Sequence, residues 1–178
     1  MGASRGAIAG IMSGAVQPFP NNYRYWRLYW VDDLVPDSGG TFALWNEIEW
    51  YTIANKGGTK YSITPTFFDI GTGNFGNPYS GQLASLSNGV TTENDYDGAA
   101  FAMWRNSIAG SWLKFDMGTA RTLKSVAVYI HSAYFGTRHM HIDGSDDGTT
   151  WIRGVSNAQF PNNVDGGIEV HPVVINIP

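Results

Sequence analysis

The sequence has no cysteine among its 178 residues, so neither a disulfide framework nor a thiolate metal site can form. Charged residues make up only 15%, the Lys and Arg residues are scattered, and the net charge is -4. This balance lacks the basic footprint needed for nucleic acid or an anionic membrane surface. Residues 1–16 form an apolar run interrupted by Gly, too short to span a bilayer and unlike a signal peptide. We therefore predict neither nucleic-acid binding nor membrane insertion.

Helix signals are nearly absent, whereas residues that favour strands and turns are abundant. Hydrophobic residues make up 43% of the chain and aromatic residues 14%, and there are 22 Gly. Aromatic side chains favour strands, and Gly favours the tight turns that join them. The length suits one domain with a substantial core. Composition alone therefore favours one domain of many short strands.

Alternation of apolar and polar residues marks the first strand, 23–30. Trp26, Leu28 and Trp30 fall on one face, a period of two that is typical of a half-buried strand. From 59 to 111 only short apolar runs occur among Gly, Asn and Ser, and we predict loops there. Further strands are predicted at 112–117, 125–130, 139–143, 150–153 and 169–177. The pattern predicts an all-β sandwich.

A second strand is predicted at 44–51. Ile48 and Trp50 share one face, and Glu47 and Glu49 share the other. The strand therefore has one apolar and one acidic side.

Two short strings match known binding loops, but their surroundings do not fit. Residues 71–76 read Gly-Thr-Gly-Asn-Phe-Gly, like a dinucleotide-binding turn, yet Pro78 follows where a helix must begin. Residues 93–98 resemble the start of a helix-loop-helix calcium loop, but Trp104 stands where the closing Glu is required. We interpret both segments as surface turns.

The histidines and acidic residues form no persuasive reactive set. His139 and His141 point the same way on a predicted strand, opposite Met140 and Ile142, which places them on the outer face with no third ligand. There is no nucleophile elbow and no arrangement of His, Ser and Asp that the strand pattern would bring together. We therefore predict that the chain is not an enzyme.

Several segments together resemble the discoidin, or galactose-binding-like, family, which includes coagulation-factor type C domains and family 32 carbohydrate-binding modules. The residues that carry the resemblance are Ser-Trp-Leu-Lys-Phe-Asp-Met-Gly at 111–118, the Gly-Ser-Asp-Asp-Gly-Thr-Thr-Trp hairpin within 141–151, the loop 84–92, the pair within 101–104, Arg-Tyr-Trp-Arg-Leu at 24–28 and Trp-Asn-Glu-Ile-Glu-Trp at 45–50. In most discoidin domains the strands that correspond to 24–28 and 45–50 come last in the sequence. Here they begin it, as in a circular permutation that resembles modules of bacteriophage tails and other virion proteins.

The resemblance implies a discoidin-like jelly-roll sandwich over 22–178, preceded by an extended assembly arm at 1–21. It implies core positions for Trp26, Trp112 and Trp151. The implied function is a structural or adhesive virion subunit of a bacteriophage tail or tail fibre, assembled in the host cytoplasm. Its partners would be other virion subunits, including copies of itself, and a host-attachment glycan. The alternative is a secreted bacterial carbohydrate-binding module.

The same resemblance implies a Ca2+ site beside the loop 84–92. Carried over residue by residue, the ligands are Glu47, Leu86, Asn88, Val90 and Thr92. Asn88 stands where the family has Asp, which removes a charge that a hard cation favours. Two expectations stay open: a weaker calcium site, or a loop closed by hydrogen bonds.

The family binds ligands on loops at one end of the sandwich, which correspond here to 71–82, 104–111, 131–139 and 153–167. Aromatic rings can stack on a sugar, and Arg, Asn and His can hydrogen-bond its hydroxyls. A contact with another protein would use the same residue types. The candidate ligand-binding residues are His131, Tyr134, Phe135, Arg138, Arg105 and Asn106.

Overall fold

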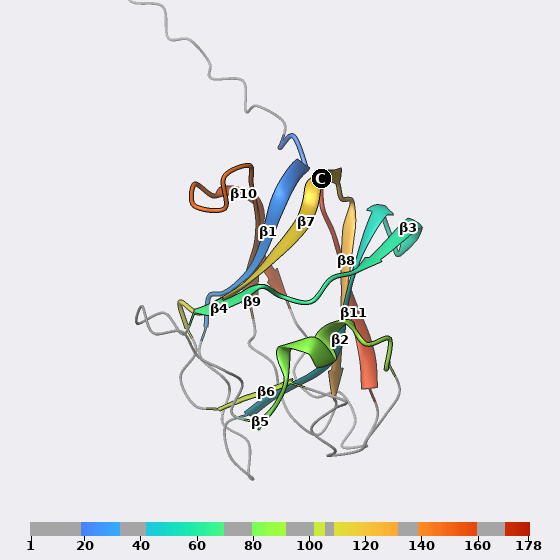
Figure 1. Cartoon of the computed structure of the whole chain (residues 1–178), viewed down its shortest axis with the longest axis vertical. Helices are drawn as coiled ribbons and strands as arrows, with labels where there is room; N and C mark the ends of the chain where they lie inside the picture. Colours follow the sequence, from blue (N-terminus) through green and yellow to red (C-terminus); the bar gives the residue numbers. More distant parts are fainter. Residues whose placement is uncertain are drawn as a thin grey trace, which may run out of the picture.

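The computed structural model describes residues 19–32, 42–69, 80–91, 102–105, 109–131, 139–159 and 170–178. These residues form two antiparallel sheets packed face to face, which confirms the all-β sandwich (Figure 1). The one helix in these ranges is a short 3-10 turn, η1 (Leu83–Ser87). No helix in these ranges is long and apolar enough to cross a membrane.

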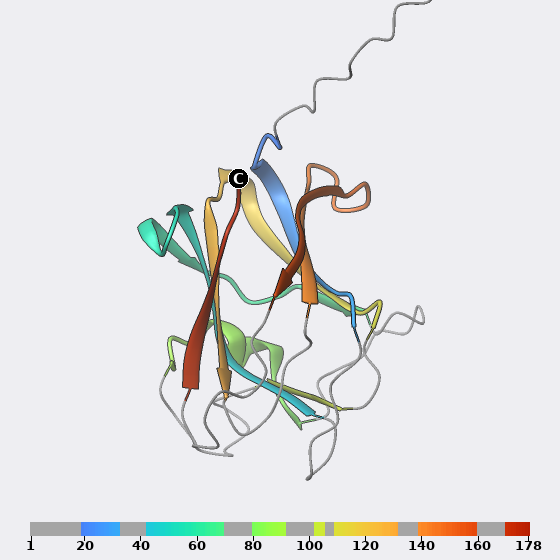
Figure 2. The same cartoon turned by 180° about the vertical axis from the view of Figure 1, so that it is seen from behind.

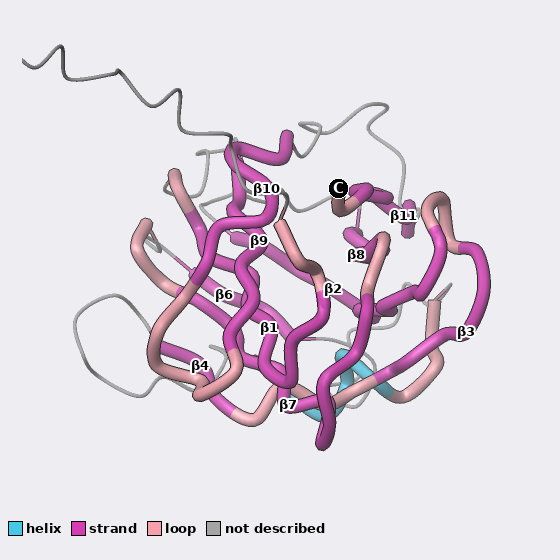
Figure 3. Tube along the Cα trace, turned by 90° about the horizontal axis from the view of Figure 1, so that it is seen from above, coloured by secondary structure: helices cyan, strands magenta, loops and turns pink. Residues whose placement is uncertain are grey.

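One sheet has five strands, in the spatial order β10-β9-β1-β7-β4, and the other has the order β11-β8-β2-β6-β5, with β3 paired to β2. Figure 3 views both layers from the end where the C-terminus lies. The strands are β1 (Asn22–Trp30), β2 (Phe42–Ile53), β3 (Gly57–Ser62), β4 (Phe67–Asp69), β5 (Ser80–Gly81), β6 (Ala102–Arg105), β7 (Trp112–Thr122), β8 (Ser125–His131), β9 (His139–Ser145), β10 (Ile152–Gln159) and β11 (Val170–Asn176).

The core lies between the sheets and is rich in tryptophan. Trp26 and Trp30 of β1 are fully buried, as the alternation predicts. Trp30 stacks on Trp45 of β2, with ring centroids 5.1 Å apart. Trp45 joins Ile48 and Trp50 in the core because the pairing of β2 with β8 shifts register between Trp45 and Glu47. Such a bulge changes which face a side chain occupies.

The prediction of loops throughout 59–111 is wrong. This stretch holds most of β3 together with β4, β5, η1 and β6. The strands in question are short, from two residues in β5 to six in β3. β3 and β6 pair with the longer strand β2, β4 pairs with β7, and β5 pairs with β6, so each takes its register from a partner. Strands this short carry too few residues to show an alternation of their own.

The expected core positions of Trp112 and Trp151 are also wrong, whereas that of Trp26 is confirmed. In β7 it is Leu113 and Phe115 that face the core, so Trp112 projects from the outer face and is half-buried. Its ring meets the half-buried ring of Trp151, with centroids 5.6 Å apart. The two rings belong to a small packed layer outside the five-stranded sheet.

The two ends of the described chain meet at one end of the sandwich. The side chain of Asn21 donates a hydrogen bond to the carbonyl of Pro178. Phe19 packs against Tyr23 and Trp26, with ring centroids 5.3 and 6.0 Å away. Figure 2 shows the C-terminus beside the blue start of β1. Packing of the sandwich therefore includes Phe19, within the segment predicted as arm; residues 1–18 lie outside the described residues.

Candidate functional site

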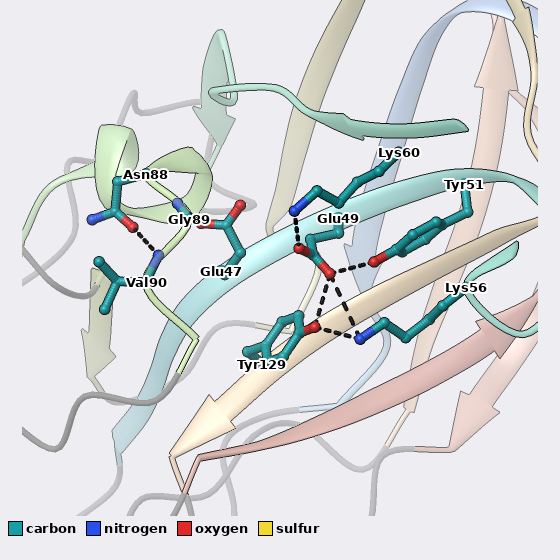
Figure 4. Close-up of polar contacts among 9 residues, drawn as sticks. All are labelled: Glu47, Glu49, Tyr51, Lys56, Lys60, Asn88, Gly89, Val90 and Tyr129. Carbon is teal, nitrogen blue, oxygen red and sulfur yellow. Dashed lines mark hydrogen bonds and ion pairs between the residues drawn. The ribbon is translucent and has the colours of Figure 1, made fainter. Parts of the chain in front are cut away.

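Three polar side chains of β2 project from the outer face of the six-stranded sheet, because alternate residues of a strand share a face. They are Glu47, Glu49 and Tyr51, with exposed fractions of 0%, 3% and 6%. The side chain of Lys60, from the neighbouring strand β3, reaches over this face to Glu49, and η1 contacts β2 (Figure 4). The acidic face predicted for this strand is therefore real, but it is buried.

Glu49 is surrounded by donors. Its Oε1 accepts a hydrogen bond from Lys60 Nζ at 2.7 Å. Its Oε2 accepts from the hydroxyls of Tyr51 at 2.5 Å and Tyr129 at 2.8 Å. Lys56 Nζ lies 3.8 Å from the same Oε2 and also donates to the Tyr129 hydroxyl. Both carboxylate oxygens are thus fully engaged.

These contacts keep the Glu49 network in one protonation state. Burial raises the pKa of Glu49, but the bonds from Lys60, Tyr51 and Tyr129 outweigh it, and the net pKa lies below its ordinary value. Burial and the contact with Glu49 raise the pKa of Tyr51. At neutral pH the carboxylate is ionised and its donors stay protonated, an arrangement that holds a structure together rather than one that transfers protons.

Glu47, two residues earlier on the same face, has far fewer partners. Its Oε2 accepts a hydrogen bond from the backbone N of Gly89 at 2.9 Å. Its Oε1 is buried and has no hydrogen-bond partner among the described residues. Burial raises the pKa of this carboxyl; the bonds from Gly89 and Ser62 lower it, and the net shift is upward.

The loop that faces Glu47 is a tight turn after η1. Asn88 Oδ1 accepts a hydrogen bond from the backbone N of Val90 at 2.9 Å. Gly89 has φ of +83°, a left-handed conformation that glycine adopts at little cost. Figure 4 shows the carboxylate of Glu47 lying against this turn.

The structure thus brings Glu47 against the loop that holds Leu86, Asn88 and Val90, as the calcium-site prediction requires; Thr92 lies outside the described residues. The buried, unpartnered Oε1 of Glu47 is the kind of oxygen that a hard cation takes. Among the described residues no group of three or more His, Asp and Glu could hold a metal. A cation here would depend on carbonyl and amide oxygens, and the site stays a prediction.

The candidate ligand-binding residues are only partly described. His131 ends β8 and Arg105 ends β6, at the end of the six-stranded sheet opposite the chain ends. Tyr134, Phe135, Arg138 and Asn106 lie outside the described residues.

The two outward histidines have separate partners. His139 Nδ1 lies 2.6 Å from Asp32 Oδ2. The His141 ring stacks on Tyr29, and its Nδ1 accepts a hydrogen bond from the backbone N of Asn157 at 3.0 Å. Burial lowers the pKa of His141. These contacts explain both side chains without a shared metal.

Sequence reasoning missed the Glu49 network entirely. Its signal was present in Tyr51, which follows Glu47 and Glu49 at the same spacing, and in the turn at Lys56 that returns Lys60 to the strand. In this chain the outward polar residues of β2 are followed at once by the β2–β3 hairpin, and they are buried.

No family model matches the chain, and no curated protein or solved structure shows significant similarity to it. The fold defines the class of the chain as an antiparallel β-sandwich. The discoidin resemblance rests on the motifs quoted above.

Proposed function

We propose that this chain is a non-enzymatic structural and adhesive module of a virion, a subunit of a bacteriophage tail or tail fibre. In this proposal it binds neighbouring subunits, including copies of itself, and a carbohydrate of the host surface. The jelly-roll topology of the discoidin type is part of the same proposal.

The observation that carries the proposal is the polarity of the sandwich. The contact between Asn21 and Pro178 places both described ends of the chain together. The strand ends at His131 and Arg105, which lead into the predicted ligand segments, lie at the opposite end. A module tethered at one end leaves the other free for recognition, as in many sandwich folds whose loops bind ligands.

The chemistry of β2 supports a binding role over a catalytic one. Of the two described glutamates of β2, Glu49 has more hydrogen bonds, and its oxygens are occupied by lysine and tyrosine donors. A general base needs a free lone pair directed at a substrate. We therefore assign Glu49 a structural role, in which its hydrogen bonds stabilise the fold.

Glu47 would help to hold a Ca2+ ion together with the loop 86–92. When bound, the ion would neutralise the buried carboxylate and fix the loop. Two hydrogen bonds already fix part of the loop in this chain: Glu47 accepts one from the Gly89 amide, and Asn88 accepts one that closes the turn.

The test combines two changes at opposite ends of the module. Tyr134→Ala with Phe135→Ala alters the proposed recognition end, and deletion of 1–18 removes the arm while sparing Phe19, which packs on Trp26. Tyr25→Ala, on the half-buried outer face of β1, is the matched control. Each variant is measured for incorporation into particles and for adsorption of particles to host cells.

We expect the arm deletion to abolish incorporation, since the apolar residues of 1–18 that would pack on a neighbouring subunit are then missing. We expect the double variant to assemble and to lose adsorption through glycan sites that are weak singly and strong in many copies. Normal assembly and adsorption by all three variants would refute the roles proposed for the arm and for the recognition end. Absence of the unchanged chain from particles would refute the virion proposal. Binding of the isolated chain to a polysaccharide, without any incorporation, would favour the secreted module instead.

A further inference from the structure

The turn that faces Glu47 contains a reactive dipeptide. Asn88–Gly89 is the only Asn-Gly pair in the chain. In such a pair the backbone nitrogen of Gly can attack the side-chain carbonyl carbon of Asn, because glycine has no side chain to hinder the approach. The product is a cyclic imide that water opens to aspartate or isoaspartate.

Solvent reaches both residues. Asn88 and Gly89 are exposed. A Cβ placed on Gly89 would meet no atom within 4 Å. Water, the co-reactant of the second step, therefore has free access to the turn.

The folded turn nevertheless keeps the reacting atoms apart. Asn88 has φ -92° and ψ -4°. Ring closure requires the Gly89 nitrogen to lie on the same side as the Asn88 Cβ, and this ψ turns it away. Two hydrogen bonds hold the conformation: Gly89 N to Glu47 Oε2, and Val90 N to Asn88 Oδ1, both 2.9 Å.

We propose that Asn88 is a site of spontaneous deamidation controlled by Glu47, protected while the carboxylate holds the Gly89 amide and reactive when that bond opens. In the reaction the Gly89 nitrogen forms a bond to Asn88 Cγ and gives up its proton. The Cγ–Nδ2 bond breaks, and the nitrogen leaves as ammonia with that proton. Water then adds to one imide carbonyl and cleaves its bond to the Gly89 nitrogen.

The aspartate product changes what the turn can bind. It places a second carboxylate in the loop beside the buried Glu47, and carboxylate oxygens are the preferred ligands of hard cations. The turn would thereby gain affinity for a divalent cation as the protein ages. This consequence rests on the proposed cation site, whereas the deamidation itself does not.

The reaction is measured on the full chain in mildly alkaline buffer, by mass spectrometry of the peptide that holds Asn88 and by isoaspartate assay. Asn88→Gln is the unreactive control, and the exposed Asn157 is the internal reference. Glu47→Gln keeps an acceptor for the Gly89 amide, whereas Glu47→Ala removes it. The unchanged chain is also measured unfolded in urea.

We expect Asn88 to react at least about fivefold faster in urea than in the folded chain, the effect of one hydrogen bond on an opening equilibrium. Glu47→Ala should approach the unfolded rate, and Glu47→Gln should lie between. Equal rates in folded and unfolded chains, or no conversion in urea, would overturn the proposal. If Glu47→Ala does not fold, the urea ratio and Glu47→Gln decide the outcome.

The cation consequence is tested separately with CaCl2 and a chelator. Fresh protein, aged protein and Asn88→Asp are compared by their melting temperatures. We expect the rise with calcium to be larger for the aged protein and for Asn88→Asp than for fresh protein. Deamidation with no calcium response in any sample would refute the cation site and leave the modification standing. An equal response in all three would refute only the consequence drawn for aging.

Discussion

Glu47 and Glu49 are the same residue type, two positions apart on one strand, on the same face and almost equally buried, yet their pKa values move in opposite directions. The difference comes from donors. Glu49 receives bonds from one lysine and two tyrosines. Glu47 receives the Gly89 amide, with a contribution from Ser62, and retains an unpartnered oxygen.

The comparison shows that burial alone does not mark a functional carboxylate. Desolvation is the largest influence on both groups, and it disfavours the ionised form in both. Where donors are plentiful, the carboxylate becomes a structural anchor. Where they are few, the remaining demand for positive charge is met by a proton or by a cation. Glu47 is therefore the candidate for cation binding, and Glu49 is the candidate for a structural role.

The largest expected effect is on stability. Glu49→Ala leaves the Tyr51 and Tyr129 hydroxyls and two lysines without their acceptor, and we expect a loss of roughly 3 kcal/mol, at the low end for a broken buried pair because the lysines are partly exposed. Glu47→Gln should change stability by less than about 1 kcal/mol without cation, since it keeps an acceptor for Gly89. Urea denaturation measures both. A loss from Glu49→Ala no larger than that from Glu47→Gln would mean that Glu49 is not the better-partnered carboxylate.

Sequence reasoning anticipated much of this framework where a strand shows its own periodicity. Trp26, Leu28 and Trp30 were placed correctly because β1 alternates from Tyr25 to Trp30. Placing Glu47 beside the loop of Asn88 depended on the family resemblance, since no local pattern links residues so far apart in the chain.

The features that sequence analysis did not predict depend on contacts with neighbouring strands. Trp45, for which no position was predicted, enters the core through a register shift between β2 and β8. The burial of Glu49 depends on its contact with Lys60 of β3, a strand too short to be recognised from its own alternation. Trp112 lies outside because it alternates with Leu113 and Phe115, which face the core. Its expected core position came from the family resemblance and not from the local pattern. The positions of Trp45 and Glu49 are decided by tertiary packing, which overrides local preference.

The next effect in size concerns Ca2+. If Glu47 and the loop hold the ion, chelation should lower the melting temperature and calcium should restore it, by the equivalent of about 2.7 kcal/mol at a hundredfold excess over Kd. Glu47→Gln should abolish the response. Glu49→Gln should melt lower throughout and keep it. A wild-type melting curve indifferent to both treatments would show that hydrogen bonds alone close the loop.

The smallest expected effect is on the pH dependence of stability, and here the two glutamates should act in opposite directions. The folded pKa of Glu49 lies below its ordinary value of 4.5, so its contribution is present above pH 4.5 and is lost as the pH falls through the folded pKa. The folded pKa of Glu47 lies above 4.5, so its contribution is present below pH 4.5 and is lost as the pH rises through the folded pKa.

These opposite slopes can be separated by difference. The free energy of unfolding is measured in urea from acidic to neutral pH for the unchanged chain, Glu47→Gln and Glu49→Gln. Subtracting Glu47→Gln should give a contribution that decreases toward neutral pH, and subtracting Glu49→Gln one that decreases toward acid. Calcium should flatten the first curve only, because a bound cation favours the ionised form of Glu47. Parallel curves would mean that both carboxylates share one environment, and the division between anchor and binding group would fail.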